Sequence, residues 1–262
     1  TGTRTPTIYG NWINGTGTTV SGSGQTTFGG RGSQTITSAG VTFTQGITLN
    51  SPSGTLTLQD ALTTSRGAPG AFTLTNGTLD LNGKTLTLSA SVSAGFATAA
   101  GTKNITFNGG TLGTTTTFTL NSNRGIALTG NGTIDVANGT TLTYNGIMAG
   151  SGNFTKANTG TLNLGGNSTY SGSTTINAGT LSISSDSNLG TAPGSVAATQ
   201  LTFGGGELLV TADTTINTNR GITLNTGGGK LSAASSKTLT YGGVIAGSTA
   251  LTIGTSDYTG TV

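Results

Sequence analysis

The feature that most limits the fold of this chain is a short, recurrent pair of apolar residues with one small polar residue between its members. Such pairs run from residue 56 to residue 253 and include Leu86/Leu88, Ile134/Val136, Leu142/Tyr144 and Leu162/Leu164. Alternation with a period of two puts the apolar members on one face of a half-buried strand. Threonine, which often stands beside them, is β-branched and favours strands. No segment has the apolar spacing of an amphipathic helix, so the sequence predicts an all-β chain.

Asn-Gly steps separate many of these pairs. They begin at Asn14, Asn76, Asn82, Asn108, Asn131, Asn138 and Asn145. Because asparagine and glycine tolerate positive φ, we expect tight turns at these steps.

The chain also repeats itself. NITFNGGTL at 104–112 returns as QLTFGGGEL at 200–208, and NSNRGIALT at 121–129 returns as NTNRGITLN at 217–225, both at an offset of 96 residues. TLTYNGIMAGS at 141–151 returns as TLTYGGVIAGS at 238–248, at an offset of 97. Strand pairs inside each unit recur every eight or so residues, which suits three short strands per coil and about 20–25 residues per coil. A β-sandwich has short strands too, but a single sandwich domain does not repeat along the chain.

These patterns favour a right-handed parallel β-helix, a solenoid with about three short strands per coil. Its expected organisation is an N-terminal segment over 1–36, acting as a cap or an assembly contact, followed by a β-helix over 37–262. Repeat units occupy 104–199 and 200–262 within that helix. At roughly 22 residues and ~4.8 Å per coil, we expect a rod of about twelve coils and some 55–60 Å.

Composition excludes several kinds of site. The 262 residues include neither cysteine nor histidine, which removes disulfides, thiolate metal sites and the usual nucleophile and base pairs. No two acids are adjacent or alternate on one strand, so catalysis would require acids that meet across coils; the seven are Asp60, Asp80, Asp135, Asp186, Glu207, Asp213 and Asp257. We expect no enzyme activity, no metal and no cofactor.

The charge pattern and the lengths of the apolar runs argue against two classes of partner, nucleic acids and membranes. The ten basic residues are spread along the sequence, whereas nucleic-acid binding requires a clustered basic face. No apolar run approaches the ~20 residues of a transmembrane helix, so we expect no membrane insertion. Two short motifs, GNGTIDV at 130–136 and NGKT at 82–85, depart from the calcium nonapeptide and the P-loop. We interpret the first as a turn leading into a strand, with Asp135 between the inward Ile134 and Val136, and the second as a turn.

Residues 160–184 read GTLNLGGNSTYSGSTTINAGTLSIS, and this stretch resembles the passenger-associated transport repeat of bacterial autotransporters, a relative of the autotransporter-associated β-strand repeat. The matching positions are Gly160, Leu162, Leu164, Asn167, Tyr170, Gly172, Thr174, Ile176, Gly179 and Leu181. The resemblance implies a β-helical bacterial protein that is extracellular or on the cell surface. It implies no enzymatic activity.

Two functions then compete. In the first, the chain is a structural building block of a surface fibre or matrix that assembles head to tail as a homo-oligomer; in the second, it is an adhesin fragment that binds surface glycans or cells. SDYTGTV at 256–262 aligns with NSTYSGST at 167–174, which places Tyr258 opposite Tyr170 in a coil that stops early. Together with Tyr9 and Trp12 in TIYGNWING, Tyr258 is a candidate assembly contact. Truncation of a longer passenger would leave the same incomplete coil.

Overall fold

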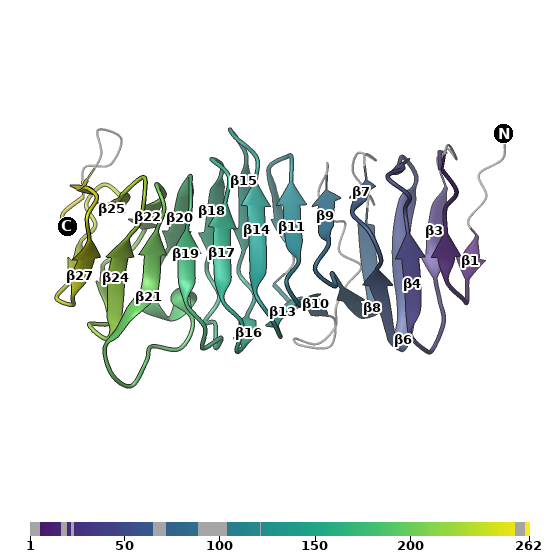
Figure 1. Ribbon diagram of the computed structural model, residues 1–262, viewed down its shortest axis with the longest axis horizontal. Helices are drawn as coiled ribbons and strands as arrows, with labels where there is room; N and C mark the ends of the chain where they lie inside the picture. Colours follow the sequence, from purple (N-terminus) through teal and green to yellow (C-terminus); the bar gives the residue numbers. More distant parts are fainter. Residues whose placement is uncertain are drawn as a thin grey trace.

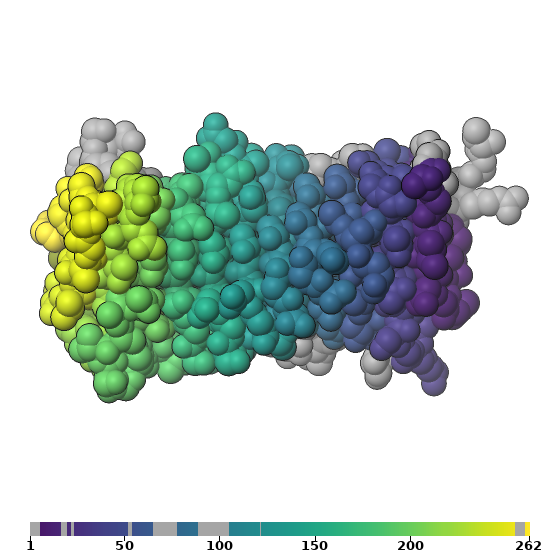
Figure 2. Space-filling view, viewed as in Figure 1, coloured from purple at the N-terminus to yellow at the C-terminus, as the bar shows by residue number. Residues whose placement is uncertain are grey.

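The computed structural model describes residues 6–16, 20–21, 24–64, 72–88, 104–120, 122–254 and 260–262. Over these residues the chain is an all-β parallel solenoid of about ten turns (Figure 1). The strands run across the long axis of a rod, and the first and last turns lie at its opposite ends (Figures 1 and 2). The described residues include one 3-10 helix, η1 (Asp186–Leu189).

Three long sheets form the sides of the rod. A nine-stranded sheet contains β1 (Thr7–Ile8), β2 (Trp12–Ile13), β3 (Gln25–Phe28), β4 (Gln34–Thr37), β6 (Gly46–Leu58), β8 (Phe72–Asp80), β10 (Asn104–Phe107), β13 (Gly125–Leu128) and β16 (Met148–Gly150). A ten-stranded sheet contains β5 (Thr42–Phe43), β7 (Leu62–Thr64), β9 (Thr85–Leu88), β11 (Thr111–Thr114), β14 (Gly132–Val136), β17 (Phe154–Ala157), β19 (Thr174–Ile176), β21 (Ala197–Phe203), β24 (Arg220–Leu224) and β27 (Ile245–Gly247).

A seven-stranded sheet contains β12 (Phe118–Leu120), β15 (Thr141–Tyr144), β18 (Thr161–Leu164), β20 (Thr180–Ile183), β22 (Glu207–Val210), β25 (Gly229–Ala233) and β28 (Leu251–Ile253). A two-stranded sheet of β23 (Thr214–Ile216) and β26 (Leu239–Tyr241) completes the side that the nine-stranded sheet leaves after β16. Between β16 and this two-stranded sheet, the backbone N–H groups of residues 169–171 donate to the carbonyl oxygens of Met148 and Gly150, and η1 follows.

The core is a column of apolar side chains stacked turn upon turn. Leu162 of β18 lies in register with Leu142 of β15 and Leu181 of β20, and all three side chains are fully buried. Their neighbours Thr161 and Asn163 lie on the outer face and are half-buried. The inward placement predicted from the alternating pairs is confirmed here.

The turns are more uneven in length than the 20–25 residues per coil that the sequence predicts. One turn takes 20 residues from Phe154 to its partner Thr174, whereas the next takes 27 from Thr174 to Leu201, because η1 and residues 190–196 are inserted at a corner. The expected twelve coils are therefore about ten. The ten-stranded sheet accordingly spans about 45 Å at the usual spacing between strands.

The Asn-Gly steps behave in two ways. Asn82 and Gly83 have φ of 45° and 70° and form the predicted tight turn between Leu81 and β9. Asn76 instead lies inside β8, so the turn predicted there is wrong. β6 and β8 run through this corner as long strands, and a register shift around the Asn50–Asn76 pair takes up the change of direction.

The two copies of the sequence repeat lie on different sides of the rod. Residues 104–107 form β10 of the nine-stranded sheet, whereas the matching residues 200–203 belong to β21 of the ten-stranded sheet. In the same way, β11 and β14 lie in the ten-stranded sheet, but their counterparts β22 and β25 lie in the seven-stranded sheet. One repeat thus covers four full turns of the solenoid plus one of its three sides.

Candidate functional surfaces

Several of the acidic side chains join one turn to the next. Asp60 accepts hydrogen bonds from the backbone N–H groups of Ser38 (2.7 Å) and Ala39 (2.6 Å) in the preceding turn. Asp213 accepts one from the backbone N–H of Thr238 (2.9 Å) in the following turn. A carboxylate committed to backbone donors in this way stabilises a corner.

The acids nearest in sequence, Glu207 and Asp213, also have separate partners. Glu207 accepts hydrogen bonds from the hydroxyls of Thr180 (3.1 Å) and Ser232 (2.6 Å) on the strands at either side of it. Among the described residues, no three Asp or Glu side chains lie close enough together to hold a metal ion. The residues that the structure describes also contain no helix with the length and apolar content to cross a bilayer.

Two buried arginines occupy equivalent positions in the repeat. The guanidinium of Arg220 pairs with the carboxylate of Asp186 at 2.8 Å and donates to the carbonyl oxygens of Leu189 (3.1 Å) and Gly190 (2.6 Å). This network fastens η1 to the next turn. Arg124 is as deeply buried, and burial lowers its pKa to about 10. Neither side chain is available to an external anion.

A lysine stands within the apolar column. Lys156 lies in register with Ile134 and Ile176, and its side chain is fully buried. Its Nζ donates to three carbonyl oxygens at the corner, those of Ala157 (2.7 Å), Asn158 (2.6 Å) and Ala178 (3.3 Å). Burial lowers the pKa of this amine to about 8, and the negative charge of Asp135 acts in the opposite direction. The ammonium therefore binds corner carbonyls from inside the rod.

The candidate assembly residues fall at the N-terminal end or outside the described chain. Tyr9 is 76% exposed, whereas Trp12 is half-buried and packs its ring 6.2 Å from that of Phe43. Ile13, which the sequence reading did not single out, is 77% exposed. Tyr258 lies outside the described residues.

The outer face of the ten-stranded sheet carries one threonine on each of seven consecutive strands. We call this set the threonine ladder; its members are in register, and they are Thr85, Thr111, Thr133, Thr155, Thr175, Thr202 and Thr223. Two shallow hollows border the ladder, one of about 390 Å³ around Gly113 and one of about 610 Å³ around Gly204. The sequence showed a threonine-rich outer face, but the alignment depends on turn lengths that it does not reveal.

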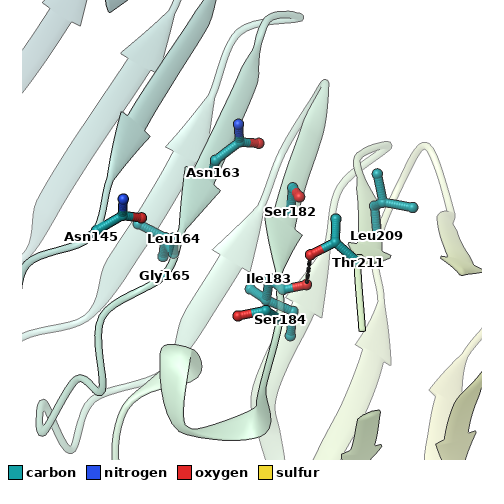
Figure 3. Close-up of a pocket in the computed structure, with 9 residues that line it drawn as sticks. All are labelled: Asn145, Asn163, Leu164, Gly165, Ser182, Ile183, Ser184, Leu209 and Thr211. Atoms are coloured by element: carbon teal, nitrogen blue, oxygen red, sulfur yellow. Dashed lines mark hydrogen bonds between the residues drawn. The ribbon is translucent and has the colours of Figure 1, made fainter. Parts of the chain in front are cut away.

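A third hollow, of about 380 Å³, lies on the outer face of the seven-stranded sheet (Figure 3). Amides of Asn145 and Asn163 and hydroxyls of Ser182 and Ser184 line it, with Leu209 at its far side. The amide of Asn163 already donates to the hydroxyl of Thr143 at 3.2 Å.

The segment that resembles the transport repeat forms part of the solenoid wall. Tyr170 is fully buried, its hydroxyl lies 2.6 Å from that of Thr174, and its ring meets the ring of Phe154 edge-on at 6.3 Å. Gly179 has a φ of 63°, and a side chain at Gly172 would collide with the backbone of the turn below. The motif positions therefore serve packing and close stacking of turns.

A family model described as the passenger-associated-transport-repeat matches residues 154–183, which run from β17 to the end of β20. Comparison with curated proteins and with solved structures gave no match. The matched residues coincide with the wall segment just described, and the repeat implies a secreted or cell-surface bacterial protein. The chain thus carries a passenger-associated transport repeat within a parallel β-solenoid, consistent with an autotransporter passenger.

Proposed function

We propose that this chain is a non-enzymatic, elongated scaffold at or beyond the bacterial surface, built from stacked passenger repeats. The observation that carries the proposal is the transport repeat at 154–183, whose strands lie within the continuous ten-stranded and seven-stranded parallel sheets. The placement of the acids supports a structural role, since Asp60, Glu207 and Asp213 each bond between turns. A solenoid of this kind has large lateral faces for its length.

The proposal is tested by locating the chain in the bacterium that encodes it. Intact cells are treated with protease, and the chain is followed by antibody in the cell, surface and medium fractions. We expect the chain in the medium, or on the cells in a protease-sensitive form. A chain found only in the cytosolic fraction and protected from protease would overturn the proposal.

We further propose that copies of the chain associate head to tail. Exposed apolar side chains gather at both ends of the rod, with Tyr9 and Ile13 at one end and Val244, Ile245 and Ile253 at the other. β27 and β28 each pair with a strand on one side only among the described residues, and a strand edge binds another strand readily. A head-to-tail contact does not close on itself, so it would produce a filament.

Sedimentation of the purified chain at micromolar concentration tests this association. We expect species larger than a monomer, and we expect Ile13→Lys to reduce them without changing the far-UV circular dichroism. A monomer at every concentration would refute the filament. The alternative role, an adhesin that binds through a lateral face, would then be the better account.

A further inference from the structure

The threonine ladder follows one face of the rod and does not follow the repeat. Thr111 and Thr133 of the ladder correspond in the second repeat copy to Glu207 and Lys230, which lie on the seven-stranded sheet. The ladder continues instead through Thr202 and Thr223 on β21 and β24, which occupy other positions in the repeat. Copying of the repeat therefore does not account for the aligned threonines.

Most ladder hydroxyls are free of intramolecular bonds. Within the described part of the chain, the first five, from Thr85 to Thr175, have no hydrogen-bond partner, and all five side chains are half-buried on the outer face. Thr202 and Thr223 differ, because their hydroxyls donate to the carbonyl oxygens of Thr199 (3.4 Å) and Ala198 (2.8 Å). A hydroxyl both donates and accepts, so five consecutive rungs offer both kinds of hydrogen bond, ~4.8 Å apart.

Amide groups run beside the ladder on one side. Two residues before Thr133 and Thr155 stand Asn131 and Asn153, both exposed. The Oδ1 of Asn131 accepts from the backbone N–H of Asn153 (3.3 Å), and the Oδ1 of Asn153 accepts from the backbone N–H of Ser173 (2.9 Å). These bonds fix both amides, and the two Nδ2 groups make no hydrogen bond to any described residue.

The other side of the ladder is hollowed. Depressions of about 390 and 610 Å³ lie around Gly113 and Gly204; Thr85 and Thr111 of the ladder border the first, and Thr223 borders the second. Asp135 is the one acid that lines either hollow, and Lys156 on the same sheet is buried. The strip formed by the ladder, the two asparagines and the two hollows is therefore nearly uncharged. It is rich in hydrogen-bond donors and acceptors, which recur at the spacing of the turns.

We propose that the threonine ladder, with Asn131 and Asn153, binds an extended, neutral polysaccharide laid along the long axis of the rod. Each sugar ring in such a polymer offers hydroxyls that both donate and accept, and its advance along an extended chain is close to one rung. The scarcity of exposed cations on the strip disfavours acidic polymers. The proposal names a ligand for the adhesin alternative, and it rests on the proposed function only in placing the chain where such polymers occur.

The test uses the purified chain and two insoluble, extended neutral polysaccharides, cellulose and chitin, with heparin-agarose as an acidic comparison. Thr133→Val/Thr155→Val removes two ladder hydroxyls and keeps side-chain shape and β-propensity. The matched control is Thr141→Val/Thr161→Val, an in-register pair on the seven-stranded sheet. Equal urea midpoints of both variants and the parent chain establish that folding is unchanged.

We expect retention on cellulose, chitin or both, weakened at least about tenfold in the ladder variant and less than about twofold in the control. Absence of retention on both neutral polymers, equal weakening in the two variants, or tighter retention on heparin would each overturn the proposal. Inhibition of ice recrystallisation without retention on either polymer would assign the ladder to ordered water and also overturn it. The protease test on intact cells is independent, so either proposal can fail while the other stands.

Discussion

Lys156 makes the stability of the rod depend on pH in the alkaline range. Burial lowers the pKa of its amine from 10.5 to about 8, and the unfolded chain restores the ordinary value. Below about pH 8 the amine is protonated in both states, so it contributes no pH dependence. Between about pH 8 and 10.5 the unfolded state binds more protons than the folded state. The free energy of unfolding should therefore rise with pH across this window.

The size of the effect follows from the shift. One pKa unit corresponds to about 1.36 kcal/mol, so a fall from 10.5 to about 8 sets a ceiling of roughly 3 kcal/mol. We expect roughly 1–2 kcal/mol between about pH 8 and 10, because three carbonyl oxygens favour the charged amine. Above about pH 10, the buried phenols of two tyrosines oppose this rise in the unfolding free energy. Burial raises the pKa of Tyr144 and raises that of Tyr170 to about 12, so these groups lose their protons first in the unfolded chain.

The assay is urea unfolding followed by far-UV circular dichroism at several values from about pH 7 to about pH 10. Lys156→Met keeps the length of the side chain and removes the titrating group, so its unfolding free energy should lose the rise. Lys230→Met is the matched control, because Lys230 is an exposed strand lysine, and it should keep the rise. If the unfolding free energies of the parent chain and Lys156→Met changed with pH by the same amount, the reasoning would be refuted.

Three further substitutions test the packing. Leu162→Ala, at a fully buried position, should lower the unfolding free energy by roughly 2–5 kcal/mol in urea titrations, and the outward Asn163→Ala by less than about 1 kcal/mol; equal losses would contradict the inward assignment. Asp186→Ala leaves the buried guanidinium of Arg220 without its carboxylate and should cost roughly 3–5 kcal/mol, so an unchanged melting temperature would rule out the pair as an anchor. Gly152→Ala places a methyl group against a carbonyl oxygen of the turn below and should cost roughly 1–3 kcal/mol in thermal unfolding; a neutral result would mean that neighbouring turns separate easily.

The sequence was sufficient for the solenoid because its period-two pairs are local. Leu86/Leu88 and Ile134/Val136 are all buried, as their alternation predicted. Asp135 lies outward between two buried neighbours, which agrees with its interpretation as part of a strand. These placements depend only on strand geometry, which each short segment carries by itself.

The features that required the structure depend on turn length. Asp186 and Arg220 are 34 residues apart, so their ion pair follows from an inserted corner and not from a local motif. Arg124, the counterpart of Arg220, has Ala90 at that separation, so the repeat does not reveal the pair either. In the sequence Lys156 is one of ten evenly spread basic residues, although its place two residues after Phe154 is an inward strand position.

Each repeat covers four turns of the solenoid and one additional side, and this affects how such a protein can lengthen. Duplication of the 96-residue unit would build a screw, with every added copy turned by about one third of a revolution relative to the last. A fourth copy would return to the orientation of the first. Whatever a unit carries on its surface would then wind around the rod, whereas a straight line of like residues must arise by separate substitutions. Growth by duplication therefore distributes a surface feature of the unit around all sides of the rod. Selection on single positions can instead place like residues along one side.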